Sequence, residues 1–132
     1  MPLAHGVTAR LPAAFNNVVK ALELLDYASS VYLEVFETQP RIAIAVGEKY
    51  FFRAGNYLSS TTLVIEDGDH TIVKIVASGG RRGLLDLFDL GSAKDYANDI
   101  LYDLCGKIGV KPETIVEVDY LDKSRSNKMK IQ

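Results

Sequence analysis

The sequence Ser-Gly-Gly-Arg-Arg-Gly-Leu-Leu-Asp-Leu-Phe-Asp-Leu-Gly-Ser, at residues 78–92, divides the chain into two parts with different patterns. Before it, alternating and β-branched residues favour strands, and after it the clearest helical pattern begins. Leu84, Leu85 and Phe88 favour packing of this stretch against the core or against an interface. The sequence therefore predicts a crossover from a sheet to a helix here.

The helix after the crossover has clear start and stop signals. Ser92 and Asp95 match the Ser-x-x-acid form of a capping box. An apolar stripe at helical spacing follows, made of Tyr96, Ala97, Ile100, Leu101, Leu104 and Ile108. Gly109 stands where a helix commonly ends, and Pro112 cannot continue one. These signals predict a helix that ends before Gly109.

A hairpin is the best local signal before the crossover. Residues 66–69, Glu-Asp-Gly-Asp, supply the positive φ angles of a tight turn, so residues 63–65 and 71–76 should pair. In the second strand, Ile72 and Val76 share a face with Lys74, and the opposite face is also apolar. We therefore expect a central strand that is at least partly covered on both faces.

The N-terminal part predicts a strand at residues 7–11 and then a helix. The helix starts at Pro12, where a missing N–H is tolerated, and ends near Tyr27. Residues 31–37 and 41–46 are expected to form a second hairpin. In its second strand, small alanines alternate with larger residues, so something bulky must pack over the thinly filled face.

The remaining segments predict less regular structure. Residues 47–56 indicate a strand extension with a bulge near Gly47, and residues 57–65 resume the strand. Residues 114–120 either add a last strand or pack over an edge.

In chain order the pattern is strand, helix, four strands, helix and an extended C-terminal segment. Two amphipathic helices need an apolar partner, so we predict an α+β fold, with an antiparallel sheet of about five strands and both helices on one face. Such a fold offers two places for a site. One is a pocket between a helix and the sheet, and the other is the uncovered sheet face, available to a partner or a second copy.

Length and charge suggest a single domain with a different C-terminal end. The 132 residues fit one domain, and 48% hydrophobic residues suffice for a core. We assign residues 1–120 to this domain and residues 121–132 to a basic, flexible tail. The tail carries +3 of a net charge of −2, which leaves −5 on the domain. An acidic domain makes nucleic acid an unlikely partner.

Several functional classes find no support in the sequence. No apolar run can span a membrane, no signal peptide is recognisable, and the single cysteine fits a cytoplasmic location. His5 lies in a terminus expected to be mobile, and Cys105 is expected to be a small buried residue. We predict no catalytic residue, no metal site and no cofactor.

An anion-binding site is one hypothesis for the crossover. Its backbone N–H groups, guanidinium groups and helix start come from Gly79, Gly80, Arg81, Arg82 and Ser92. The alternative is a plain turn in which Arg82 pairs with Asp86 or Asp89, whose charges would repel an anion. The spacing matches neither a P-loop nor a dinucleotide-binding motif.

An aromatic group is the second candidate site. It comprises Tyr50, Phe51, Phe52 and Tyr57, together with Phe88 from the crossover. Three adjacent aromatics in a strand cannot all face the core, so at least one must point away from it. We expect these residues to line a pocket or a dimer contact, and base stacking is the alternative.

The segments Glu48-Lys49-Tyr50-Phe51-Phe52-Arg53, Ser78-Gly79-Gly80 and Phe88-Asp89-Leu90-Gly91 together resemble a family of small uncharacterised bacterial and archaeal proteins, classed as a domain of unknown function. The resemblance covers about residues 7–108 and implies no activity or cofactor. The element order is also similar to TATA-binding-like and helix-grip folds, a likeness that concerns the fold alone.

The leading hypothesis is a non-enzymatic domain that binds a small ligand or a protein partner and self-associates as a homodimer. It depends on the missing catalytic constellation and on the apolar surplus in residues 50–58 and 84–90. The alternatives are an enzyme or sensor acting on an anionic metabolite at the crossover, and a nucleic-acid-binding module.

Overall fold

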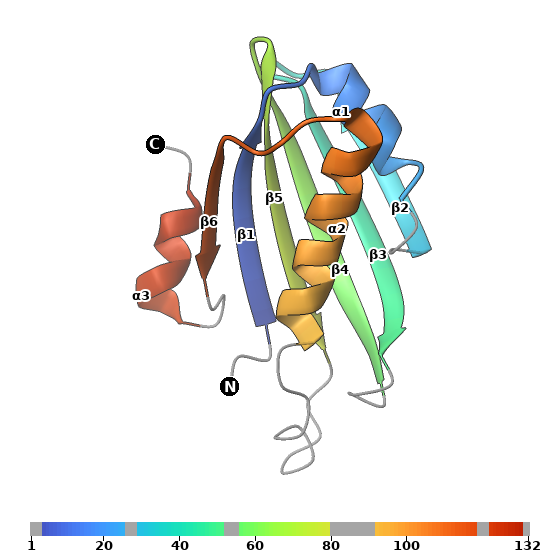
Figure 1. The fold of residues 1–132 in the computed structure, drawn as a ribbon, viewed down its shortest axis with the longest axis vertical. Helices are drawn as coiled ribbons and strands as arrows, with labels where there is room; N and C mark the ends of the chain where they lie inside the picture. Colours follow the sequence, from blue (N-terminus) through green and yellow to red (C-terminus); the bar gives the residue numbers. More distant parts are fainter. Residues whose placement is uncertain (1–3, 26–28, 52–55, 80–91, 119–121, 131–132) are drawn as a thin grey trace.

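The computed structural model describes residues 4–25, 29–51, 56–79, 92–118 and 122–130. Within these ranges it has a six-stranded antiparallel sheet with helices packed on it (Figure 1). The strands are β1 (Ala4–Leu11), β2 (Ser29–Phe36), β3 (Ile42–Phe51), β4 (Asn56–Asp67), β5 (His70–Gly79) and β6 (Thr114–Val118). The helices are α1 (Phe15–Leu22), α2 (Ser92–Ile108) and α3 (Lys123–Ser126), followed by a 3-10 turn at Asn127–Met129. The predicted α+β class is confirmed.

The strand order across the sheet is β2-β3-β4-β5-β1-β6. The N-terminal strand pairs with β5 on one side and with β6 on the other, with Arg10 opposite both Ile72 and Thr114. Residues 114–118 therefore extend the sheet, which is the first of the two alternatives predicted for them. The sheet has one strand more than the approximate five expected.

Helices α1 and α2 lie on the same face of the sheet (Figure 1). Side chains along β5 alternate between the two faces of the sheet, and this alternation places Val73 and Ile75 beneath these helices, where both are fully buried. Tyr96, Ile100 and other apolar residues of α2 meet them from above, also without exposure. Burying each such aliphatic side chain contributes about 1.5–3 kcal/mol. This layer is the core, and it confirms the predicted placement of two amphipathic helices on one face.

Two glycines adopt the backbone that the sequence predicted for them. Gly68 has φ +64° and begins the two-residue turn between Asp67 and His70, where a glycine in the first central position suits a tight hairpin turn. Gly109 has φ +84° directly after α2, and its N–H donates to the Cys105 carbonyl at 2.8 Å. The hairpin and the helix end are therefore where the sequence placed them.

Two local predictions were wrong in position. Helix α1 ends at Leu22 and not near Tyr27, because the Leu24 N–H bonds the Ala21 carbonyl and closes the last turn at 3.0 Å. The irregularity expected near Gly47 lies instead in β2, between Ser30 and Tyr32, directly across from Gly47. The extra residue is on the edge strand, so β3 runs unbroken.

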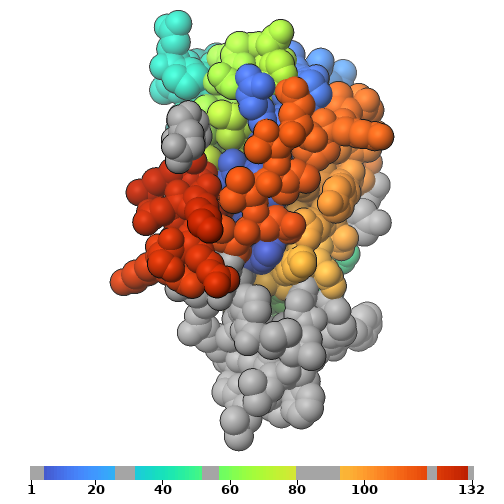
Figure 2. Space-filling view, turned by 60° about the vertical axis from the view of Figure 1, so that its left-hand side comes forward, coloured from blue at the N-terminus to red at the C-terminus, as the bar shows by residue number. Residues whose placement is uncertain are grey.

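The C-terminal segment folds against β1 and β6. Asp122 caps α3 by accepting the Ser124 N–H at 2.9 Å. Met129 is buried over Gly6 and Val118, and Thr8 Oγ1 donates to the Met129 carbonyl at 3.0 Å. Figure 2 shows this segment in red beside β6 and β1. The mobility expected for this tail stays a prediction.

No helix among the described residues combines the length and the apolar character needed to cross a membrane.

Candidate functional site

The sheet face opposite α1 and α2, here called the open face, carries a continuous apolar row. Phe36, Ile42, Ile65 and Ile72 stand opposite one another across β2, β3, β4 and β5. Phe36 is 39% exposed, and the other three are partly exposed. A contiguous apolar surface of this kind is typical of an interaction site.

The next rows extend this surface and show its limit. Ile44 and Leu63 stand side by side in the second row, followed by Lys74 on β5. Partial burial among these neighbours lowers the pKa of Lys74 from its ordinary value. Ser59 and Ser78 occupy a polar row farther along the strands, between this surface and the exposed Tyr50 and Tyr57. The apolar region is therefore centred on β3 and β4.

The alternation in β3 explains why the open face is apolar. Ala43 and Ala45 are buried on the helix side, where close packing of the helices leaves room for small side chains. The larger Ile42, Ile44 and Val46 consequently point to the open face. The thinly filled face predicted from the alanines is the covered one, and the bulky residues are left outside.

The predicted aromatic group is divided between the two faces. Tyr50 and Tyr57 are exposed on the open face and form an edge-to-face pair with ring centroids 5.2 Å apart. Phe51 packs instead against buried Tyr96 at 5.4 Å. This confirms that the adjacent aromatics cannot all face the core. Phe52 and Phe88 lie outside the described residues.

The predicted anion site lies largely outside the described residues, which exclude Gly80, Arg81 and Arg82. Ser92 begins α2, but its side chain also falls outside the description. Gly79 ends β5 beside Leu58, and a Cβ at this position would lie 3.0 Å from Leu58 Cγ. Close packing therefore accounts for Gly79, and the anion site stays a prediction.

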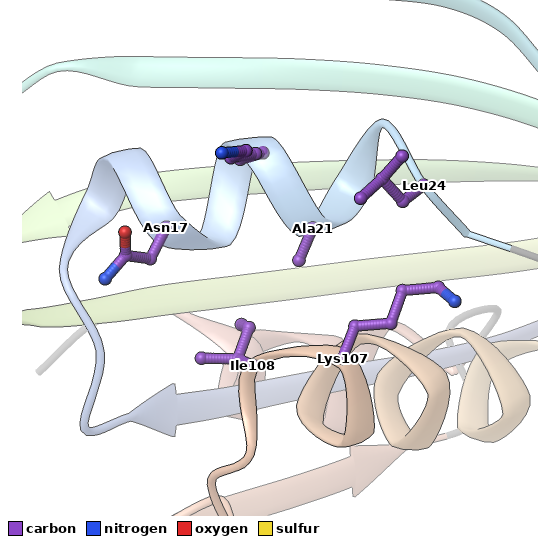
Figure 3. Close-up of a pocket in the computed structure, with 6 residues that line it drawn as sticks. Asn17, Ala21, Leu24, Lys107 and Ile108 are labelled. Carbon is purple, nitrogen blue, oxygen red and sulfur yellow. The ribbon is translucent and has the colours of Figure 1, made fainter.

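One shallow pocket lies between α1 and the end of α2 (Figure 3). Its volume is about 280 Å³, and Ala21 and Ile108 point into the gap from the two helices. Lys20 and Lys107 flank this apolar floor, and Lys107 is 3.7 Å from Asp103. The pocket corresponds to the helix-side position expected from the sequence, although it opens between two helices and not beneath one.

A second pocket, of about 330 Å³, lies on the open face where the C-terminal segment crosses the end of the sheet. It is lined by Thr8, Ala9, Arg10, Asp67, Ile72, Thr114, Val116, Lys128 and Lys130. Arg10 donates to Asp67 at 3.1 Å and to Glu113 at 3.4 Å. Sequence reasoning missed this site because it treated the lysines as a solvated tail.

The two histidines have carboxylate partners. His5 was expected in a mobile terminus, but it lies buried in β1 with Nε2 3.0 Å from Glu117 Oε1. Burial opposes ionisation of Glu117, yet hydrogen bonds from His5 and Asn98 hold its pKa below the ordinary value. The pairing of β1 with β6, distant in sequence, is what brings this histidine into the fold.

Neither a metal site nor a reactive thiol emerges from the described residues. No group of three His, Cys, Asp or Glu side chains among them is placed to hold a metal ion. His70 lies between Asp69 at 2.8 Å and Glu113 at 2.7 Å. Cys105 is buried as expected, and this burial raises the pKa of its thiol.

Arg41 and Glu66 join the first helix to the sheet, and they make stability depend on pH. Arg41 Nη2 is 2.8 Å from Glu66 Oε2, and the guanidinium lies over the Phe15 ring at 4.8 Å. The hydrogen bond from Arg41 holds the pKa of Glu66 below its ordinary value of 4.5. The stabilisation is therefore complete above that value and is lost as the pH falls through the folded-state pKa.

We expect Glu66→Gln to lower the Tm at pH 7 and to lower it less at pH 3, because the stabilisation by the ionised carboxylate decreases once the pH falls below 4.5. Differential scanning calorimetry at both pH values measures this difference. Glu23→Gln, which changes an exposed glutamate just after α1, serves as the control and should change the Tm little at either pH. A Tm deficit in Glu66→Gln that is equal at pH 7 and pH 3 would contradict this pH dependence.

These features define an α+β domain with a packed helix-side core, an apolar open sheet face and surface pockets between α1 and α2 and beside the C-terminal segment. The chain belongs to the family of unknown function DUF6054, whose model matches residues 7–104. This confirms the predicted resemblance to a domain of unknown function. The described segment 122–130 lies outside the matched range.

The chain is similar to two solved structures. A conserved protein from Geobacillus kaustophilus has 10% identity and a TM-score of 0.48, and the match covers 87% of this chain and 99% of that one. The protein TTHA0849 from Thermus thermophilus has 10% identity and a TM-score of 0.40, with 80% and 96% covered. No curated protein sequence matches this chain.

Proposed function

We propose that this chain is a non-enzymatic binding domain that self-associates through its open face to form a homodimer. The observation that carries the proposal is the apolar row of Phe36, Ile42, Ile65 and Ile72, extended by Ile44 and Leu63. Two such faces can pack on each other in the manner of a β-sandwich, about 10 Å apart, with the side chains of the two sheets interdigitating.

The size of the open face fits a dimer. Four strands spaced about 4.8 Å apart and about 30 Å long present about 600 Å² in total, with the polar row of Ser59 and Ser78 included. Stable interfaces bury about 600–1,000 Å² on each partner, so the region over β2 to β5 reaches the lower end of this range. Its exposed aromatic side chains, Phe36 at 39% and Tyr32 at 50%, are of the types that anchor interfaces.

The positions of the charged side chains are consistent with self-association through the open face. Along the first row no charged side chain interrupts β2 to β5, and the first cation, Arg10, stands on β1. Glu34 and Lys74 lie in the second row on either side of Ile44 and Leu63. An apolar centre with charges at its border matches the anatomy of interfaces between protein copies.

The test is the oligomeric state of wild type and of Ile65→Asp, measured by sedimentation equilibrium. We expect a reversible wild-type dimer and a dissociation constant at least about 100-fold higher for Ile65→Asp, because a carboxylate would be buried without a partner. Phe36→Asp, at the exposed edge strand, provides a second variant with little risk to folding.

Ser59→Asp is the matched control, since it adds the same charge to the same strand and face but in the polar row. Its dissociation constant should stay within about threefold of wild type. A wild-type protein that remains monomeric at about 100 μM, or equal weakening by Ser59→Asp and Ile65→Asp, would overturn the proposal.

The other hypotheses stay predictions. They are an enzyme or sensor for an anionic metabolite at the crossover, and a nucleic-acid-binding module, the less favoured of the two. A cytoplasmic location is likewise a prediction.

A further inference from the structure

The pocket on the open face beside the C-terminal segment combines an apolar floor with positive charge. Ile72 and Val116 lie on either side of β1 and present aliphatic surface from β5 and β6. Thr8 lies between them on β1, and its hydroxyl is engaged with the Met129 carbonyl at 3.0 Å. The methyl group of Thr8 therefore adds to an apolar floor with few free polar groups.

The lysines of the C-terminal segment supply the charge. Lys128 and Lys130 line the pocket on either side of buried Met129, which fixes the segment to the sheet. Neither lysine forms an ion pair with any residue that the structure describes. Two ammonium groups that have no anionic partner among the described residues therefore lie near an apolar floor.

The guanidinium of Arg10, unlike the two lysine ammonium groups, is not available to an anionic ligand. It is engaged by Asp67 at 3.1 Å and by Glu113 at 3.4 Å, so its donors are committed to carboxylates. The lining of the pocket holds the three cations Arg10, Lys128 and Lys130 and one carboxylate, Asp67, so it carries a net positive charge. A negatively charged ligand would reduce this excess, and lysine ammonium groups would meet it as point charges.

We propose that this pocket binds a small monoanionic carboxylate with a short apolar chain, its carboxylate at Lys128 and Lys130 and its chain over Ile72 and Val116. The pocket volume of about 330 Å³ suits a molecule of this size. A phosphate group would favour bidentate guanidinium donors, which Arg10 has already committed. The inference goes beyond self-association, because this site extends over β1 and β6 and shares only Ile72 with the proposed dimer contact, which is centred on β3 and β4.

Isothermal titration calorimetry with octanoate tests the proposal. We expect a saturable Kd of about 0.1–1 mM for the wild-type chain. Octan-1-ol lacks the charge and acetate lacks the chain, so each should bind at least about 10-fold more weakly. Inorganic phosphate is the fourth probe and should not compete with octanoate.

Lys128→Gln/Lys130→Gln should weaken octanoate binding at least about 10-fold without changing the fold. Lys20→Gln/Lys107→Gln removes the same charge from the pocket between α1 and α2 and should leave the Kd within about twofold. ¹H–¹⁵N spectra should show octanoate-dependent shifts at Thr8, Ile72 and Val116.

Three outcomes would overturn the inference: no saturable octanoate binding, equal affinity for octan-1-ol, or competition by inorganic phosphate. Shifts confined to Ala21 and Ile108 would also overturn it, because they would place octanoate in the other pocket. Sedimentation of the lysine variant separates this proposal from the first, since its dimer should persist while octanoate binding is lost.

Discussion

Tyr96→Ala should lower the free energy of unfolding by about 3–5 kcal/mol, because it removes the largest fully buried side chain of the core. Tyr96 lies on α2 and packs against Phe51 of β3, so the cavity would open between the helix and the sheet. Urea unfolding measured at one fixed protein concentration gives the change. Tyr102→Ala on the exposed side of the same helix, where the tyrosine is 59% exposed, should cost no more than about 0.5 kcal/mol.

The Tyr96 hydroxyl should have an effect of its own. Ser60 Oγ donates to it at 3.3 Å, and both side chains are buried. Tyr96→Phe leaves the Ser60 hydroxyl without this partner and should cost about 1–3 kcal/mol. Ser60→Ala should cost a similar amount, and the double variant should cost clearly less than the sum. Strict additivity would show that the two hydroxyls do not depend on each other.

Local signals allowed much of the helix-side fold to be predicted. The turn at Gly68 and the end of α2 at Gly109 both need a positive φ, which few residues other than glycine adopt readily. The apolar stripe of α2 has a helical period that a strand cannot bury. Such features are encoded within a few residues, so they need no knowledge of the rest of the chain.

Long-range pairing could not be predicted in the same way. β6 pairs with β1 across more than 100 residues, and this pairing turns His5 from a terminal residue into a buried partner of Glu117. Alternation in β3 shows that two faces exist, but it does not say which one the helices cover. The open face and its apolar row therefore became apparent only when the strands were placed in register.

The C-terminal pocket depends on a close approach that the sequence hardly signals. Gly6 has no distinctive sequence context near the N-terminus, yet a Cβ there would overlap Met129 Sδ. Because Gly6 has no side chain, Met129 can pack directly on β1. Gly6 and Met129 form one packing contact, although more than 120 positions separate them in the sequence.

Gly6→Val should release the C-terminal segment while leaving the strand intact, since valine favours strands. A flexible methionine can swing away from one methyl group, so Gly6→Ala should have a small effect. The branched side chain of valine would occupy the space that buries Met129, whose burial contributes about 1.5–3 kcal/mol. Trypsin cleavage after Lys123, Arg125 and Lys128 should then be about 10- to 100-fold faster, because cleavage follows the population of the open segment.

Gly6→Val/Met129→Ala makes room for the new side chain and should recover part of the protection that Gly6→Val loses. Octanoate binding should likewise be strongest in wild type, weakest in Gly6→Val and intermediate in the double variant. The reason is that release of the segment carries Lys128 and Lys130 away from Ile72 and Val116. Tail cleavage in wild type as fast as in Gly6→Val would contradict docking and support the mobile tail expected from the sequence. Slow cleavage in wild type with recovery in the double variant would establish that the packing of Met129 on Gly6 holds the C-terminal segment, and with it Lys128 and Lys130, against the sheet.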